Sequence, residues 1–215
     1  MQRLALFDLD NTLIDRDLAF RAWAEEFAGT RGLGADGVEV LVGLDRESRP
    51  RRDVFFGLVR DRFGLAEPVE TLWTGYRRRM PYLVTCRPEV LNGLAALRES
   101  GWKLGIVTNG MADNQFGKIR RTGLADAVDG YAVSGAENIR KPDRRLFEIA
   151  ADRCGASPAD GGWMVGDNLV ADIEGGRGAG LRTIWVDHGN RPDAGHGADH
   201  VVGDVTDAFR ILSLA

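Results

Sequence analysis

Short apolar runs separated by longer amphipathic stretches form the pattern of hydrophobic and polar positions along this chain. The runs are continuous rather than alternating, as expected for strands buried on both faces of a parallel sheet. The stretches between several of these runs carry apolar residues three and four positions apart, which is typical of helices. The pattern predicts strands over residues 4–9, 104–108, 163–165 and 183–186, with a weaker candidate over 130–134.

Two amphipathic stretches lead into predicted strands. Residues 88–100 carry apolar side chains on one helical face and end at Gly101, and residues 144–154 do the same and end at Gly155. A glycine just past an apolar helical face is a common stop signal for a helix. Strands that alternate with such helices predict an α/β protein, with a Rossmann-like, doubly wound parallel sheet covered on both faces.

One interval breaks this alternation. The first strand ends near Leu9, yet the helix that leads to the second strand begins only near Pro88. A βαβ unit runs to roughly 30 residues, and long structureless loops are uncommon in compact domains. Apolar spacings of three and four dominate the interval, so we expect residues 16–84 to form an inserted helical domain. Residues 1–15 and 85–215 should then form the core domain.

Composition and charge narrow the class of protein. The chain has 215 residues, of which 44% are hydrophobic and 28% charged, and its formal net charge is −4. A nucleic-acid binder usually has a basic face or a pI above about 9, so we expect no nucleic-acid partner. No apolar run approaches the roughly 18 residues of a membrane span, and no leader-like segment precedes the first strand. The two cysteines, Cys86 and Cys154, are far apart and fit a reducing cytoplasm.

Polar side chains follow the predicted strands at the point where each strand ends. Ligands bind outside the carboxyl ends of the strands in open α/β sheets. Several aspartates gathered there cannot all stay ionised without a cation, and carboxylate oxygens suit Mg²⁺. A lysine and a hydroxyl beside the metal would hold an anion, and the whole set describes phosphoryl transfer to an aspartate. The residues are Asp8, Asp10, Thr12, Thr108, Asn109, Lys141, Asp167, Asn168 and Asp172.

The sequence resembles the haloacid dehalogenase-like hydrolase superfamily in four short segments, which occur in the expected order: DLDNT, VTNG, RKP and GDNLVAD. The helical interval resembles the cap domain that this superfamily inserts between its first two motifs. The resemblance is to the phosphatase branch, and it implies a magnesium-dependent phosphomonoester hydrolase. Such an enzyme would act on a small phosphorylated metabolite through an aspartyl-phosphate intermediate.

The resemblance also implies roles for the acidic residues. Asp8 would be the catalytic nucleophile, and Asp10 would act as the general acid and then the general base. The Asp8 carboxylate, the Asp10 backbone carbonyl and the Asp167 carboxylate would bind Mg²⁺.

The remaining motif residues would hold the phosphoryl group and support the site. Thr108, Asn109 and Lys141 would bind phosphate, and Lys141 would also act in catalysis by offsetting the charge on Asp8. Residues of a supporting layer would be Thr12, Asn168 and Asp172.

Three alternative functions stay open. A haloacid dehalogenase displaces halide from carbon and lacks an aspartate at the position of Asp10, so Asp10 favours ester hydrolysis. A phosphomutase shares the aspartyl-phosphate step and differs in the acceptor. A non-catalytic protein that binds a phospholigand would have no need of Asp10. The sequence does not identify the substrate, the cap residues that select it, or the oligomeric state.

Two further features admit a plain and a functional interpretation. Residues 187–200 hold His188, His196 and His200 among glycines, which predicts a flexible loop rather than a zinc site. Residues 77–79 form an arginine run that predicts a solvated helix face. The alternative for this run is that one arginine of the inserted domain binds an anionic group of the substrate.

Overall fold

The computed structural model describes residues 2–48, 51–189 and 195–215. The chain divides into two compact units. Met1–Asp15 and Thr85–Ala215 form one unit, called the core unit below, and Arg16–Val84 forms the other, called the helical unit. No helix among the described residues is both long and apolar enough to cross a membrane.

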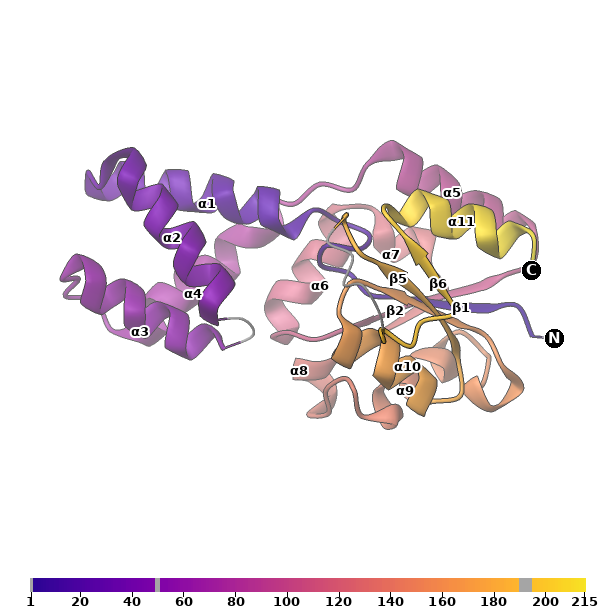
Figure 1. Cartoon of the computed structure of the whole chain (residues 1–215). Coiled ribbons are helices and arrows are strands. Elements are labelled where there is room, and N and C mark those ends of the chain that lie inside the picture. Colours follow the sequence, from indigo (N-terminus) through magenta and orange to yellow (C-terminus); the bar gives the residue numbers. More distant parts are fainter. Residues whose placement is uncertain (1, 49–50, 190–194) are drawn as a thin grey trace. The chain divides into compact units, whose positions relative to one another are not determined.

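The core unit is organised around one parallel sheet, which confirms the expected Rossmann-like α/β fold (Figure 1). Among the described residues the sheet has six strands in the order β3-β2-β1-β4-β5-β6. All of the strand pairings are parallel. The strands are β1 (Leu4–Phe7), β2 (Lys103–Thr108), β3 (Gly130–Val133), β4 (Trp163–Gly166), β5 (Arg182–Val186) and β6 (His200–Val202).

Helices cover both faces of this sheet. Figure 1 shows α5 and α11 side by side on one face, with α9 and α10 on the other. The helices of the core unit are α5 (Pro88–Glu99), α6 (Ala112–Arg121), α7 (Leu124–Ala127), α8 (Ser134–Glu137), α9 (Arg144–Arg153), α10 (Gly175–Gly178) and α11 (Val205–Ser213). Two helical segments of other types complete the described part of this unit: the 3-10 turn η2 (Pro158–Asp160) and the π-helical segment η3 (Leu169–Glu174).

The central strand β1 is buried on both faces. Leu6 belongs to an apolar cluster with Phe147 of α9 on one side of the sheet. On the opposite face of the sheet, the ring of Phe7 packs edge to face against the ring of Phe209 of α11, with ring centroids 5.8 Å apart. Full burial of such side chains contributes about 1.5–3 kcal/mol each. Packing on both sides therefore fixes β1 as far as its carboxyl end, which lies at the edge of the sheet.

The order of the strands reverses at β1. The chain first adds β2 and β3 on one side of β1, and it then returns to place β4, β5 and β6 on the other. Phe7 lies in register with Val165 of β4, so the carboxyl ends of β1 and β4 are neighbours. A crevice outside such a reversal point is where doubly wound sheets bind ligands.

The helical unit packs around an aromatic cluster. Trp23 lies at its centre, and its ring contacts those of Phe55, Phe56 and Tyr76 at centroid distances between 5.1 and 6.2 Å. The elements of this unit are α1 (Arg16–Arg31), α2 (Gly34–Ser48), α3 (Arg52–Phe63), α4 (Val69–Arg79) and the 3-10 turn η1 (Met80–Tyr82).

A buried cluster of charged and polar side chains joins all four of these α-helices. The Arg16 guanidinium donates from both terminal nitrogens to the Asp45 carboxylate, with Nη2 2.6 Å from Oδ1, and also reaches the Tyr76 hydroxyl at 3.3 Å. Arg52 donates to the same carboxylate. Burial alone would raise the pKa of Asp45, but the hydrogen bonds and charges of Arg16 and Arg52 hold it well below its usual range.

The described residues of the 187–200 stretch form no helix or strand before His200, as the loop prediction implies. His200 begins β6 and pairs in parallel with Ile184 of β5, and its ring stacks on Trp163 at 5.6 Å. His188 Nε2 donates to the Asn11 carbonyl oxygen at 2.7 Å. Residues 190–194 of this stretch lie outside the described part. The strand escaped the sequence pattern because it is only three residues long and follows a run rich in glycine.

The arginine run at residues 77–79 is partly solvated, as its pattern predicts. Arg79 is exposed and pairs with Glu26 at 2.6 Å. Arg77 is half-buried, and its guanidinium lies 5.1 Å from the centre of the Trp73 ring.

Candidate active site

A tight turn follows β1 and presents its two aspartates. The backbone N–H groups of residues 12–14 all donate to the Leu9 carbonyl, at 3.3, 3.0 and 3.1 Å. Asn11 adopts a left-handed conformation with a φ of 60°, which asparagine tolerates better than most residues. Asp8 and Asp10 therefore lie on either side of the residue whose carbonyl anchors the turn.

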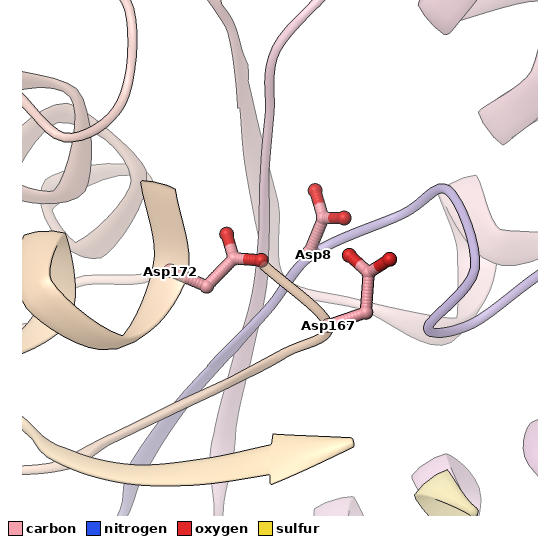
Figure 2. A group of neighbouring side chains, drawn as sticks. All are labelled: Asp8, Asp167 and Asp172. Atoms are coloured by element: carbon pink, nitrogen blue, oxygen red, sulfur yellow. The ribbon is translucent and has the colours of Figure 1, made fainter. Parts of the chain in front are cut away.

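Three carboxylates gather beside this turn. Asp8 follows β1, Asp167 follows β4, and Asp172 lies in η3. Figure 2 shows the three carboxylates close together, and one oxygen of each lies within 4.8 Å of the others. Such a set of hard oxygen donors is the kind that Mg²⁺ prefers.

Burial and mutual repulsion disfavour the charged forms of these carboxylates. Burial raises the pKa of Asp8 to about 7, although the charge of Lys141 acts in the opposite direction. Burial, together with the charges of Asp8 and Asp172, raises the pKa of Asp167 to about 8. A divalent cation at this point would favour the ionised carboxylates, so the cluster fits the expected metal.

One buried lysine lies against the cluster. The Lys141 ammonium donates to Asp8 Oδ1 and Asp172 Oδ1, both at 2.6 Å, and to the Val107 carbonyl at 2.7 Å. These contacts use all three of its donors. Burial alone would lower the pKa of Lys141, but the charges of Asp172 and Asp8 raise it above its usual range. The side chain therefore stays protonated and offsets the charge of two aspartates.

Asn109 has a partner that the sequence did not predict. Its side-chain Nδ2 donates to the Lys141 carbonyl at 3.1 Å, and its Oδ1 accepts from the Lys141 backbone N–H at 2.9 Å. The Lys141–Pro142 peptide bond that follows is cis. In this structure the Asn109 side chain fixes the backbone of Lys141, and a contact with phosphate stays a prediction.

The residues after β4 support one another. The Asn168 side chain accepts from the Val170 and Ala171 N–H groups at 3.1 and 2.8 Å, which caps the start of η3. Asp172 Oδ2 accepts from the Asn168 N–H at 3.0 Å. A Cβ atom on Gly166 would meet the Asp172 carboxylate, so this approach requires glycine.

The two threonines of the predicted set are both buried. Thr108 Oγ1 accepts a hydrogen bond from Gln115 Nε2 at 2.7 Å. Thr12 Oγ1 has no hydrogen-bond partner among the described residues. A contact of either hydroxyl with a ligand stays a prediction.

Helix α6 contributes two residues that the sequence analysis missed. The Lys118 ammonium lies 2.8 Å from each carboxylate oxygen of Asp10. Gln115 Nε2 lies 3.2 Å from Asp10 Oδ2 as well as bonding to Thr108. A signal for them existed in the sequence: the two residues are three positions apart, so they share one face of a helix that follows a predicted phosphate-binding strand.

Comparison with known proteins places the chain among hydrolases. Residues 2–180 match the family model for haloacid dehalogenase-like hydrolases. A phosphoserine phosphatase from Thermus thermophilus is 36% identical over 205 residues, which cover 90% of this chain and 79% of that protein. A glyceraldehyde 3-phosphate phosphatase from Pyrococcus abyssi is 30% identical over 202 residues, which cover 88% of this chain and 83% of that protein.

Solved structures with the same fold include both phosphatases and dehalogenases. A HAD phosphatase from Thermococcus onnurineus matches with a TM-score of 0.70 and 27% identity, over 99% of this chain and 98% of that one. A 2-haloacid dehalogenase from Pseudomonas syringae matches with a TM-score of 0.66 and 27% identity, over 100% of this chain and 99% of that one.

Proposed function

Because this chain belongs to the haloacid dehalogenase-like hydrolases, we propose that it hydrolyses a small phosphomonoester through an aspartyl-phosphate on Asp8. One observation carries the proposal: Asp8 directly follows the central strand β1 and shares one cluster with Asp167, Asp172 and Lys141. The curated relatives named as phosphoserine and glyceraldehyde 3-phosphate phosphatases support the reaction class. The two cysteines of this chain are free thiols. Free thiols are typical of a reducing cytoplasm, where we place the protein.

The carboxylate cluster would hold the metal. The Asp8 and Asp167 carboxylates and the Asp10 backbone carbonyl would be the protein ligands of Mg²⁺, as the oxygen donors and raised pKa values of the cluster support. When bound, the ion would polarise the phosphoryl group and stabilise its charge. Lys141 would hold the Asp8 carboxylate in place and would stay protonated throughout.

Two chemical steps follow from these residues. The Asp8 carboxylate would attack phosphorus, forming an acyl phosphate and breaking the bond to the ester oxygen, while Asp10 gives its proton to that oxygen. Asp10 would then take a proton from water as the water attacks phosphorus, which releases inorganic phosphate and restores Asp8. An aspartate that changes from acid to base in this way is ordinary general acid–base catalysis.

The helical unit would serve as the cap domain that selects the substrate. It is an insertion between β1 and α5 with a complete aromatic core of its own. Its acidic residues differ from the cluster because they lie in arginine–carboxylate pairs, such as Arg16 with Asp45 and Arg79 with Glu26. We therefore assign the chemistry to the core unit and the choice of leaving group to the helical unit.

The proposal is tested by a screen of phosphorylated metabolites, with Mg²⁺ and with a chelator. The wild type should release inorganic phosphate from one or more small phosphomonoesters only when Mg²⁺ is present. Asp8→Asn should abolish turnover, because an amide cannot form the acyl phosphate. Full phosphatase activity in Asp8→Asn would contradict the proposal.

The alternative functions give different outcomes in the same screen. Halide release from a 2-haloacid without Mg²⁺ would assign the chain to the dehalogenases, which share its fold at 27% identity. An isomerised sugar phosphate in place of inorganic phosphate would identify a phosphomutase. Saturable binding of a phosphate ester without turnover would identify a binding protein.

A further inference from the structure

We infer that Lys118 and Gln115 are positioning residues of the proposed reaction, and that they hold the Asp10 carboxylate and the Thr108 hydroxyl in one hydrogen-bonded unit. The inference rests on the proposed function, because it concerns how Asp10 is presented to the reacting atoms. Neither residue belongs to the motifs that the sequence analysis identified.

The use of lysine in this chain is the first support. The sequence contains lysine at only positions 103, 118 and 141, although lysine and arginine together number 28. Lys103 is exposed, whereas Lys118 and Lys141 are each only 3% exposed. The two buried lysines contact Asp10 and Asp8 respectively. An ammonium is a compact point charge, and burying one is costly unless it is paired.

The face that α6 buries is the second support. A helix normally turns apolar side chains inward, but α6 buries Asn114, Gln115 and Lys118 together with Ile119. Gln115 is only 2% exposed. Since polar groups are buried only where they find partners, this face is organised around the groups that it contacts.

Gln115 links the acid–base residue to the predicted phosphate-binding hydroxyl. Its carboxamide nitrogen donates to Thr108 Oγ1 at 2.7 Å and to Asp10 Oδ2 at 3.2 Å. Because the Thr108 oxygen accepts in this contact, its own hydrogen is left to donate to a phosphoryl oxygen. A Cβ atom on Gly110 would lie 2.8 Å from Gln115 Cγ, so the glycine makes room for this side chain.

Lys118 then fixes the plane of the Asp10 carboxylate. It contacts both oxygens at 2.8 Å, while Gln115 contacts one of them. A carboxylate held at both oxygens cannot rotate freely, and a displacement of about 1 Å at a reacting group can cost about 10²-fold in rate. Lys118 therefore acts through Asp10.

The decisive experiment compares two leaving groups. Asp10 matters most when the leaving oxygen needs a proton, as in the alkyl ester O-phosphoserine, and least for p-nitrophenyl phosphate, whose phenolate leaves readily. Lys118→Met should lower kcat/KM for the alkyl ester about 10²-fold, and for the aryl ester at least about 10-fold less, with KM little changed. Lys118→Arg should recover part of the loss. Lys103→Met, the same change at the exposed lysine, should match the wild type.

Each outcome decides the inference. An equal loss of kcat/KM on both esters overturns it, because a purely structural defect would not distinguish the two leaving groups. An unchanged kcat/KM on both esters overturns it as well. If the wild type hydrolyses neither ester nor any other phosphomonoester, the proposed function fails, and crystal structures of the wild type and Lys118→Met then decide the inference separately. We expect the Asp10 carboxylate to move away from Gln115 in the variant, and an unmoved carboxylate would overturn the positioning role.

Discussion

Lys141 and Asp8 are 133 positions apart in the sequence, yet the ammonium of one lies 2.6 Å from the carboxylate of the other. The same ammonium contacts Asp172 at the same distance, so one buried cation serves two buried acids. The strand order brings them together. Strands β1, β3 and β4 are parallel, so their carboxyl ends lie at one edge of the sheet, and the segments that begin there carry Asp8, Lys141 and Asp172. The contact therefore links the stability of the core unit to the charge state of Asp8, the proposed nucleophile.

Removing this lysine should destabilise the core unit. Lys141→Met leaves Asp8 and Asp172 facing each other without a cation, and breaking a buried ion pair by removing one partner costs about 3–5 kcal/mol. Denaturant unfolding of the metal-free protein measures the loss. The double variant Lys141→Met/Asp172→Asn should recover part of it, since one of the two stranded charges is gone. Equal stability of the single and double variants would contradict this account.

The metal-free protein should become less stable as the pH rises. Burial raises the pKa of Asp8 to about 7 and that of Asp167 to about 8, whereas an aspartate in an unfolded chain titrates near 3.9. Between about pH 4 and pH 8 the folded protein therefore binds more protons than the unfolded chain, and its stability falls through that window. Melting temperatures in a chelator, measured from pH 5 to pH 8, test this. Asp167→Asn should reduce the change of melting temperature with pH. A wild-type melting temperature that does not change over this range would contradict the raised pKa values.

Magnesium should stabilise the protein as well as activate it. A ligand that binds only the folded state at 100 times its Kd adds about 2.7 kcal/mol to the free energy of unfolding. We expect Mg²⁺ to raise the melting temperature of the wild type and Asp167→Asn to need a much higher concentration for the same shift. Glu148→Gln, which alters an exposed acid paired with Arg144 on α9, is the matched control. A Mg²⁺ response unchanged in Asp167→Asn would exclude that residue as a ligand.

The helical unit should depend on its own buried ion pair. Asp45→Asn removes the charge that balances Arg16, whose side chain is only 6% exposed, so a loss of about 3–5 kcal/mol is expected. The exposed pair of Arg21 and Glu39 offers the comparison, because solvent screens exposed ion pairs and they contribute little to stability. Urea unfolding of Asp45→Asn and Glu39→Gln gives both values. Similar small losses in the two variants would show that the Asp45 pair does not hold the unit together.

The elements that the sequence revealed are those with a strong local pattern. Continuous apolar runs such as Leu4–Phe7 predicted the strands, and glycines after amphipathic stretches predicted where α5 and α9 end. Strand β6 was missed because three residues carry too little pattern to distinguish a strand from a loop. Its pairing with β5 is decided by tertiary contact.

The parts of the site that the sequence did not reveal are contacts between distant segments. Motif order pointed to Asp8 and Lys141 one at a time, but the contact of Lys118 with Asp10 joins positions 108 residues apart. Nothing in the local pattern of α6 says which strand its buried face will meet. Likewise the Asn109 side chain follows a strand as a phosphate-binding residue would, and only the fold shows that it bonds to the backbone of Lys141.

The placement of β1 at the middle of the sheet also constrains the order in which the protein can assemble. Its neighbours are made much later in translation, since Ala5 pairs with Leu104 on one side and with Trp163 on the other. The apolar strand β1 therefore has no strand partner until those later segments have been synthesised. The helical unit, by contrast, is continuous over Arg16–Val84 and is complete before β2 is made. Pairing between such remote segments slows folding. We expect Asp8, which follows β1, to reach its final position only in the last stage of assembly, after synthesis of β4.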